Sequence, residues 1–408
     1  MKMSVSDSLV FQPKPASIAG TTHRQSVPAY NGSSFKGQQT VLINIPTGRR
    51  GHYLNTRMSY LRFKVTNNHA TAGMALDYSA SCFIQSLALY HGSNLLEQIH
   101  EYNALYHFLM DMQGSEESVE RAGSILQGSG SSRTGVSLAS SASAYFCIPI
   151  LSGVIGPLQS KYLPLGAAVG GDLRLELTLA AANTAVVSAS DADWSISDIE
   201  LQLEYVEVNS EVDRMIQQAN PRFVISCESF ANYTNTIEAA ASAKQNNLLI
   251  PARFSSLKTL YTFFRLQEDI TKKESRSISA RPYPNLKNFY YQVSGENIPS
   301  TPVRETVESF AELQKALHVF GSADNTSLIT KEIYTLTTGA ATNSGFAIGQ
   351  NLETLSHKST VTESGKNTLN TNCYLLGETD LDSNLQVSTF AHFDMILVLE
   401  NGVFTSAF

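Results

Sequence analysis

The sequence predicts an all-β protein built from two similar halves, each a β-sandwich or barrel that carries one helix. Most predicted elements are short runs in which apolar and polar residues alternate, separated by turn residues, and only three helices compete with them. An internal repeat relates the two halves. The length agrees with this division, because 408 residues exceed one ordinary core and suit two domains of about 200 residues each.

Two pairs of similar segments carry the repeat. The segment DIELQLEY at residues 198–205 is matched by DMILVLEN at 394–401, an offset of 196 residues. The segment LALYHGSNLL at 87–96 is matched by NFYYQVSGENIP at 288–299, with an offset of 203 residues between their asparagines. Both pairs keep the same order and similar offsets, which predicts one domain built twice.

The middle of the chain predicts a strand, a short helix and a second strand. Residues 199–205 alternate between apolar and polar side chains, as in a strand with one buried face. Residues 211–218 provide about two helical turns before Asn220 and Pro221 end them, and a new strand opens at Phe223. The expected division is an extended N-terminal arm at 1–36, a first β domain at 37–210, a linker helix at 211–221 and a second β domain at 222–408.

In the first half, residues 1–36 are rich in Ser, Pro, Gly and Thr without periodicity, so we expect an extended arm that orders against a neighbour. The apolar spacing from Leu95 to Met112 predicts a helix after a turn at Gly92. Residues 113–144 are crowded with Ser and Gly, which predicts an exposed loop. Strands are predicted at 39–45, 57–66, 82–90, 145–150, 172–179 and 199–205.

The second half repeats this order. Residues 306–320 predict an amphipathic helix that corresponds to the helix of the first half. Residues 268–284 are polar, charged and interrupted by prolines, so we expect a second exposed loop there. Strands are predicted at 247–250, 257–266, 289–293 and 389–399, with shorter ones around a turn at 364–367.

The charge is distributed unevenly along the chain. Residues 1–64 hold nine Lys and Arg against Asp7 alone, a balance of +8 that leaves −15 for the remainder. One interpretation is that the arm and the first strands face an anionic partner such as nucleic acid or lipid headgroups. The other is that these are solvated charges of loops and strand edges. The candidate residues are Lys2, Lys14, Arg24, Lys36, Arg49 and Arg50.

No catalytic motif is present, since GxSxG, GxxxxGK[ST], HExxH, GxGxxG and CxxC are all missing. The nine histidines are scattered and form no HxH pair, which jelly-roll metalloenzymes need. His100 and His107 could share a face of the first predicted helix, where a structural role competes with a metal or pH-sensing role. We therefore expect no enzymatic activity, no cofactor and no metal site. The sequence also predicts no signal peptide and no transmembrane segment, and hence synthesis in a reducing cytoplasm.

The chain resembles one known family in its layout. It has two tandem β-rich halves with a helix between them, an N-terminal arm, large loops and no catalytic motif. This family comprises the double jelly-roll major capsid proteins of adenoviruses, tectiviruses, Polinton-type elements and large eukaryotic DNA viruses. The resemblance covers nearly the whole chain. It rests on that layout and on the segments LALYHGSN, DIELQLEYVEV, SGENIP and AHFDMILVLENG.

The resemblance implies two tandem eight-stranded jelly rolls, each with a short helix, joined by a helical linker. It implies a structural subunit of the virion that forms a pseudo-hexagonal homotrimer in an icosahedral shell. Residues 113–144 and 268–284 would be its small outer towers. The partners implied are neighbouring capsomers, penton and minor or cement capsid proteins, and an inner membrane or the genome, reached through the arm. The alternative is a tandem jelly-roll, lectin-like attachment or spike protein.

Overall fold

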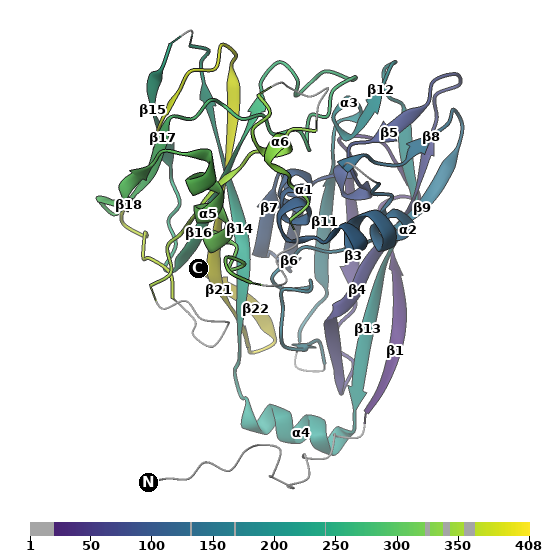
Figure 1. Cartoon of the computed structure of the whole chain (residues 1–408). Helices are drawn as coiled ribbons and strands as arrows, with labels where there is room; N and C mark the ends of the chain where they lie inside the picture. Colours follow the sequence, from purple (N-terminus) through teal and green to yellow (C-terminus); the bar gives the residue numbers. More distant parts are fainter. Residues whose placement is uncertain are drawn as a thin grey trace, which may run out of the picture.

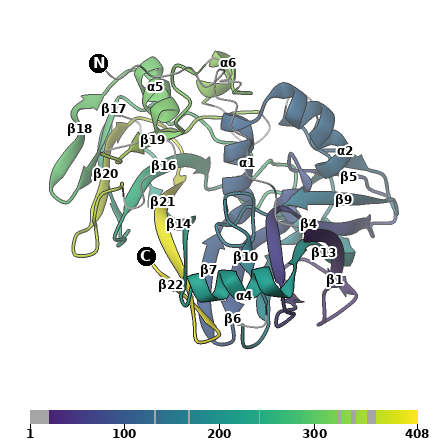
Figure 2. The same ribbon diagram turned by 90° about the horizontal axis from the view of Figure 1, so that it is seen from below.

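The computed structural model describes residues 20–130, 133–166, 169–240, 242–322, 327–337, 343–354 and 364–408. Two β-barrels stand side by side, and α4 (Ser210–Ala219) connects them at one end (Figure 1). Figure 2 shows α4 crossing this end between the last strand of the first barrel and the first strand of the second. The expected linker at 211–221 is therefore a helix in the structure, with nearly the expected bounds.

Strands of the first barrel such as β11 bury alternate side chains, as the sequence predicts. One sheet has the order β1-β13-β4-β10, with β2 beside β13 and β9 beside β4, and the facing sheet has the order β3-β11-β6-β7. The bounds are β1 (Gly20–Pro28), β2 (Ser34–Phe35), β3 (Thr40–Ile45), β4 (His52–Asn67), β6 (Ile84–His91), β7 (Asn94–His100), β9 (Ser143–Pro149), β10 (Leu163–Pro164), β11 (Leu173–Leu179) and β13 (Trp194–Val208).

Short elements lie at the end of the first barrel opposite α4 and beside the second barrel (Figure 1). They include a small sheet of order β12-β5-β8 and a helix, α1, that lies between the two barrels in both views. The bounds are β5 (Met74–Leu76), η2 (Ala80–Phe83), α1 (Tyr102–Gln113), η3 (Glu117–Ala122), α2 (Gly123–Gln127), β8 (Ser137–Leu138), α3 (Ala182–Ala185) and β12 (Val186–Ser188).

The second barrel repeats the first strand by strand. Its sheets have the orders β14-β21-β16-β19, with β22 beside β21, and β15-β20-β17-β18. The bounds are β14 (Phe223–Ile237), β15 (Lys244–Ile250), β16 (Leu257–Leu266), β17 (Asn288–Val293), β18 (Glu296–Val303), α5 (Thr306–Ala316), α6 (Lys331–Tyr334), β19 (Ile348–Asn351), β20 (Cys373–Thr379), β21 (Leu385–Glu400) and β22 (Val403–Ala407).

The two sheet orders match when β13 is aligned with β21 and the β6–β7 hairpin with the β17–β18 hairpin. The repeated segments fall in these same elements, so the prediction of one domain built twice is confirmed. In both units a long helix follows the hairpin: α1 in the first and α5 in the second. Each unit is a jelly roll of two facing four-stranded sheets with additional edge strands.

The predicted N-terminal arm is wrong over residues 20–28, which form β1. This strand pairs with β13 over its whole length, from Gly20 opposite Val208 to Pro28 opposite Glu200. It lies at the edge of the sheet, and Val27 is its one buried side chain. A polar edge strand shows no hydrophobic alternation, so the sequence pattern could not reveal it. Residues 1–19 lie outside the described part of the chain.

The first predicted helix begins too early. Residues 94–100 form β7, which pairs with β6, and α1 starts at Tyr102. Apolar residues at 95, 96 and 99 fit a helical face, but the hairpin with β6 decides the conformation instead. His100 is consequently exposed on β7 and His107 is buried in α1, so the two histidines do not share a helical face.

The barrels meet where β7 of the first lies against β14 of the second. The buried Glu97 carboxylate accepts hydrogen bonds from the Gly153 N–H at 2.9 Å and from the Ser229 hydroxyl at 2.7 Å. Ser229 belongs to β14, so this carboxylate joins the two barrels, and burial raises its pKa. Gly153 approaches β14 so closely that a Cβ at this position would overlap the Glu228 carbonyl oxygen.

We predict that Gly153→Ala lowers the free energy of unfolding by about 2–3 kcal/mol, because the added methyl group must push two backbones apart. Gly170→Ala is the matched control, since the nearest atom to its added Cβ would be the Gly402 carbonyl oxygen at an ordinary 3.5 Å. Urea denaturation of both variants measures the difference. Equal stability of the two variants would contradict the tight approach at Gly153.

Candidate functional site

The sequence places residues 268–284 in an exposed loop, but the structure buries the second half of this segment between the barrels. Residues 275, 277–282 and 284 are all buried, and Arg281 has no exposed surface. The prediction of an outer tower here is therefore wrong. The segment is polar because its side chains form hydrogen bonds and ion pairs across the junction, a reason that composition alone does not distinguish from exposure to water.

Asp111 on α1 is the centre of this junction. Its carboxylate receives a bidentate pair of hydrogen bonds from Arg133, Nε to Oδ1 at 2.9 Å and Nη2 to Oδ2 at 2.8 Å. Arg281 of the second barrel donates a further hydrogen bond to the same Oδ2. All three side chains are buried. One carboxylate of the first barrel thus ties an arginine of each unit into a single charged cluster.

The remaining donors of Arg133 reach into the second barrel. Its Nη2 donates to the Ser279 carbonyl at 2.7 Å, and its Nη1 donates to the Ser344 carbonyl at 3.0 Å. In the opposite direction, Nη1 of Arg276 in the second barrel donates a hydrogen bond to the Arg133 carbonyl at 3.0 Å. These carbonyl acceptors help to satisfy a buried guanidinium that shares its carboxylate with a second arginine.

The electrostatics of the cluster favour the ionised carboxylate. Burial alone would raise the pKa of Asp111, but the charges and hydrogen bonds of Arg133 and Arg281 outweigh it and hold this pKa below its usual value. The Arg281 guanidinium also packs beside two aromatic rings that contact each other, with its carbon 5.8 Å from the Phe108 centroid and 5.9 Å from the Phe263 centroid. Phe108 comes from α1 and Phe263 from β16, so the rings too belong to different barrels.

Asp77 and His107 extend the polar junction on the side of the first barrel. The Asp77 carboxylate accepts hydrogen bonds from the Ile278 and Ser279 backbone N–H groups of the second barrel, at 2.8 and 3.3 Å. His107 is buried one turn before Asp111 on α1, and its Nε2 lies 3.0 Å from the hydroxyl oxygens of Ser79 and Ser81. Burial lowers the pKa of His107 to about 3, so the ring is neutral in the folded protein.

Two further sets of polar contacts join the barrels. Arg265 on β16 donates from Nη2 to the Glu101 carboxylate at 2.6 Å, and the Ser388 hydroxyl donates to the same oxygen at 2.8 Å. The C-terminal strand β22 lies against the β6–β7 hairpin, where the Phe404 N–H donates to His91 Nδ1 at 3.1 Å and Asn94 Nδ2 donates to the Phe404 carbonyl at 3.3 Å. Polar contacts therefore run along the whole length of the junction.

The structure does not gather the predicted basic residues into one site. Arg49 and Arg50 are exposed in the turn between β3 and β4, at the end of the barrel beside α4. Lys36 pairs with Asp193 at 3.2 Å beyond the opposite end of β13, and Arg24 donates to Gln202 at 2.8 Å along the strand. Lys2 and Lys14 lie outside the described residues. Among the predicted basic residues that the structure describes, only Arg49 and Arg50 lie side by side, as neighbours in the sequence.

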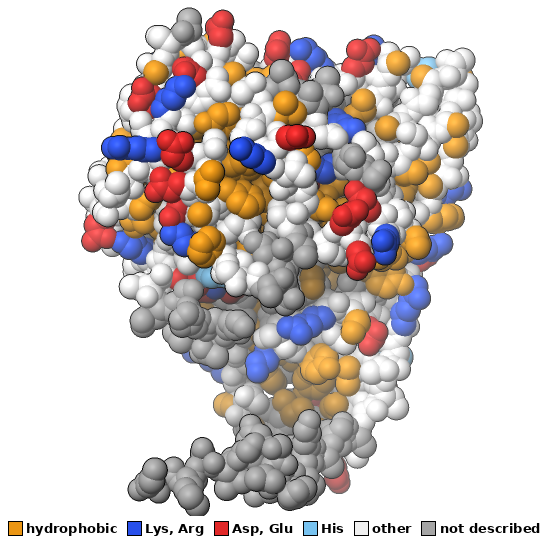
Figure 3. Space-filling view, viewed as in Figure 1, with side chains coloured by type: hydrophobic (Ala, Val, Ile, Leu, Met, Phe, Trp, Pro, Cys, Tyr) orange, Lys and Arg blue, Asp and Glu red, His pale blue; other side chains and the backbone are white. Residues whose placement is uncertain are grey.

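Large exposed apolar side chains mark other parts of the surface. Ile125 and Leu126 on α2 have exposed fractions of 82% and 51%, so the predicted loop at 113–144 is a helical surface projection over this part. Val307 on α5 and Phe320 beyond it are 76% and 62% exposed. Figure 3 shows apolar side chains gathered over the α5 region. Large exposed apolar patches on protein surfaces are commonly interaction sites.

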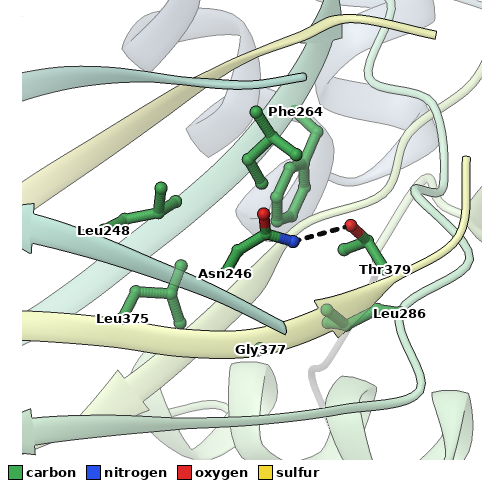
Figure 4. A pocket seen from close by; sticks show the side chains of 8 residues that line it. Asn246, Leu248, Phe264, Leu286, Leu375, Gly377 and Thr379 are labelled. Atoms are coloured by element: carbon green, nitrogen blue, oxygen red, sulfur yellow. Dashed lines mark hydrogen bonds between the residues drawn. The ribbon is translucent and has the colours of Figure 1, made fainter. Parts of the chain in front are cut away.

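The interior of the second barrel offers little space near β15 and β20. Figure 4 shows Leu248, Phe264, Leu286 and Leu375 converging on a cavity of about 10 Å³, with Asn246 Nδ2 donating to Thr379 Oγ1 at 2.9 Å. This volume accommodates about one water molecule, so side chains fill the barrel here instead of a ligand. Among the described residues, no helix has the length and apolar character needed to cross a membrane.

The residues of the junction were missed by sequence reasoning. One signal was present, because Asp111 lies three residues after Phe108 and so interrupts the apolar face of the predicted helix. A charged residue on such a face requires a buried partner. The identity of that partner was not accessible, since Arg133 and Arg281 are 22 and 170 residues away in the chain.

Comparison with known proteins identifies this architecture. No protein-family model and no curated protein matches the sequence. PBCV-1 VP54, in a crystal structure fitted into a cryo-EM reconstruction of the virophage Sputnik, superposes with a TM-score of 0.67 at 12% identity, over 98% of this chain and 100% of that chain. The Faustovirus major capsid protein gives 0.65 at 9% identity, over 96% and 92% of the two chains. The mavirus major capsid protein gives 0.55 at 10% identity, over 99% and 93%.

These likenesses establish the fold. The chain is a double jelly roll with the architecture of the major capsid proteins of large DNA viruses and virophages, as the sequence resemblance implied.

We predict that Asp111→Asn lowers the free energy of unfolding by about 3–5 kcal/mol, because it leaves two guanidinium groups buried without a counter-ion. Glu117→Gln is the matched control, since Glu117 pairs with Arg121 on the surface, where both side chains are more than three-quarters exposed. Thermal and urea denaturation measure both variants. An Asp111→Asn protein as stable as the control would show that the cluster contributes nothing to the junction.

A second prediction concerns pH. The pKa of His107 is about 3 in the folded protein and 6.5 in the unfolded chain, so between these values the unfolded chain binds a proton that the folded protein does not. Stability therefore falls as the pH falls through this window. Between about pH 7 and pH 5, we expect the wild-type protein to lose about 2 kcal/mol more than His107→Gln does.

His100→Gln controls for this pH effect, because His100 is exposed on β7. Urea denaturation at several pH values gives, for each protein, the slope of the free energy of unfolding against pH. His100→Gln is expected to keep the wild-type slope. If His107→Gln kept it as well, then His107 would not be the group responsible.

Proposed function

We propose that this protein is a viral major capsid protein, a structural subunit without enzymatic activity. The observation that carries the proposal is the agreement in fold with major capsid proteins over nearly the whole length of both chains. The function of such a protein is to form part of the shell, and it depends on the fold rather than on a catalytic site. Two buried ionic clusters are present among the described residues. The cluster of Asp111, Arg133 and Arg281 lies between the barrels, and the cluster around Lys258 lies within the second barrel.

The proposed assembly is a homotrimer. Two barrels with the same strand order stand side by side in each subunit, so three subunits around a threefold axis present six similar barrels. Six barrels in a ring give a nearly hexagonal outline, which can tile the faces of an icosahedral shell. This arrangement requires that the two barrels of one subunit keep a fixed relation, a requirement that the buried junction meets.

The exposed apolar residues support contacts between copies. Ile125 and Leu126 on α2 belong to the segment that follows the β6–β7 hairpin, and Val307 on α5 follows the corresponding β17–β18 hairpin. Each barrel thus presents exposed apolar side chains from a helix that follows its hairpin, although α5 corresponds to α1 rather than to α2. Association of subunits would remove this surface from water, and burial of apolar area is the main driving force for stable oligomers.

The end of the molecule beside α4 is the side that we assign to the interior of the particle. It carries the exposed Arg49 and Arg50 together with the exposed Glu211 and Arg214 of α4, so its charge is mixed rather than uniformly basic. β1 begins at this same end, where Gly20 pairs with Val208, and residues 1–19, with Lys2 and Lys14, precede it in the sequence. Partners proposed for this side are an inner membrane or the genome, and those for the shell are neighbouring capsomers, penton and minor or cement proteins.

The mass of the purified protein in solution tests the proposal. Light scattering is expected to give a trimer of three times 44.5 kDa, and negative-stain images are expected to show hexagonal outlines or shells. A persistent monomer over a wide concentration range would contradict the proposal. A monomer that also binds glycans on an array would instead support the alternative, a lectin-like attachment or spike protein.

A further inference from the structure

Three side chains suited to binding a metal ion meet at the end of the first barrel beside α4. The ligand atoms of His23, His52 and Glu207 all lie within 4.8 Å of one another. Among the described residues, this is the one group of three or more His, Cys, Asp or Glu side chains with such spacing. The sequence gives no hint of it, since the two histidines are 29 residues apart and the glutamate is 155 residues further along the chain.

Strand register brings the three residues together. β13 lies between β1 and β4, and His52 on β4 pairs with Glu207 while His23 on β1 pairs with Tyr205. Tyr205 and Glu207 are two residues apart on β13, so their side chains share a face of the sheet. The two histidines therefore approach this face from neighbouring strands on either side. A site built on three paired strands is held by backbone hydrogen bonds rather than by a loop.

The hydrogen bond of His52 prepares it for metal binding. Its Nδ1 lies 2.9 Å from the Arg50 carbonyl oxygen. A carbonyl oxygen only accepts hydrogen bonds, so this contact requires the proton on Nδ1 and leaves the lone pair of Nε2 free. Metal-binding histidines in proteins commonly use the second ring nitrogen in this way, because the bond fixes both the tautomer and the orientation of the ring.

Tyr205 supports both imidazole rings from below. It is buried, and its ring centroid lies 5.7 Å from that of His23, in a stacked arrangement, and 5.9 Å from that of His52. The Tyr205 hydroxyl donates to the Pro46 carbonyl at 3.3 Å, which fixes the tyrosine in turn. Both histidines are half-buried and Glu207 is exposed, so the group is supported on one side and open to solvent on the other.

We propose that His23, His52 and Glu207 bind one Zn²⁺ ion. Two imidazole nitrogens and one carboxylate oxygen are a ligand set that zinc uses in proteins, with a water molecule in the fourth position. Tetrahedral coordination requires ligand atoms about 3.3 Å apart, so the side chains must close by rotation. Glu207 is exposed and free to make most of this movement. Arg49 and Arg50, which occupy the turn before His52, oppose a cation and limit the affinity.

Zinc in this position would join the edge strand β1 to β13 and β4. Since β1 directly follows residues 1–19 in the sequence, the ion would fix the strand to which that segment is attached. An ion that binds the folded chain and not the unfolded one raises the thermal stability by mass action. This effect does not depend on assembly, so the site can be tested even if the protein has a function other than the one proposed.

The test is a zinc titration of the full-length, metal-free protein. Elemental analysis after dialysis against Zn²⁺ is expected to give about one ion per chain, and the melting temperature is expected to rise with Zn²⁺ but not with Ca²⁺, which prefers oxygen ligands. The variants His23→Gln, His52→Gln and Glu207→Gln should lose both effects. His100→Gln, which removes an exposed histidine of another strand, should keep them.

Thermal melting without metal shows whether each variant folds. Where a variant does not fold, a spectroscopic measurement on the wild-type chain tests the site instead. Co²⁺ in the proposed site is expected to give visible absorption of tetrahedral coordination by nitrogen and oxygen, displaced by one equivalent of Zn²⁺. The proposal would be overturned if the wild-type chain showed neither stoichiometric Zn²⁺ nor this spectrum. Retention of the ion by folded His23→Gln and His52→Gln proteins would overturn it equally.

Discussion

The Asp111 carboxylate is fully buried between two barrels and shared by arginines from both of them. A buried charge is tolerated only when its partners are in place, so this cluster can form in one relative position of the barrels and in no other. Every other polar contact at the junction agrees with that position. Glu97 bonds to Ser229, Asp77 to the 278–279 backbone, and Glu101 to Arg265. The barrels are therefore joined by buried polar contacts as well as by the α4 linker.

This fixed relation is what a double jelly roll needs in order to act as a building block. A pair of barrels that could swing about α4 would give subunits of variable outline, which could not repeat across a regular shell. The junction restricts the barrels by hydrogen bonds whose geometry is directional, in addition to apolar packing such as Phe108 against Tyr261 and Phe263. The apolar side chains left exposed on α2 and α5 are then available for contacts with other copies.

The sequence was sufficient to predict the fold because alternation and repetition are local signals. Strands such as Leu173–Leu179 bury every second side chain, and the repeated segments lie in equivalent strands. The errors have physical causes. The edge strand β1 is polar, so its place in the sheet depends on pairing with β13 rather than on a pattern. The polar composition of residues 275–284 predicted exposure to solvent, yet most of these residues are buried among partners that are distant in sequence. The ligands of the proposed zinc site are likewise distant in sequence, and only folding brings them together.

A cryo-EM reconstruction of the purified oligomer is the most direct test of the account. We expect a threefold particle in which each subunit contributes two upright barrels, with Asp111, Arg133 and Arg281 enclosed between them and α4 at one common end. Such a map would show the pair of barrels acting as a rigid unit of a pseudo-hexagonal capsomer. A particle without threefold symmetry, or subunits whose two barrels adopt several relative orientations, would contradict it.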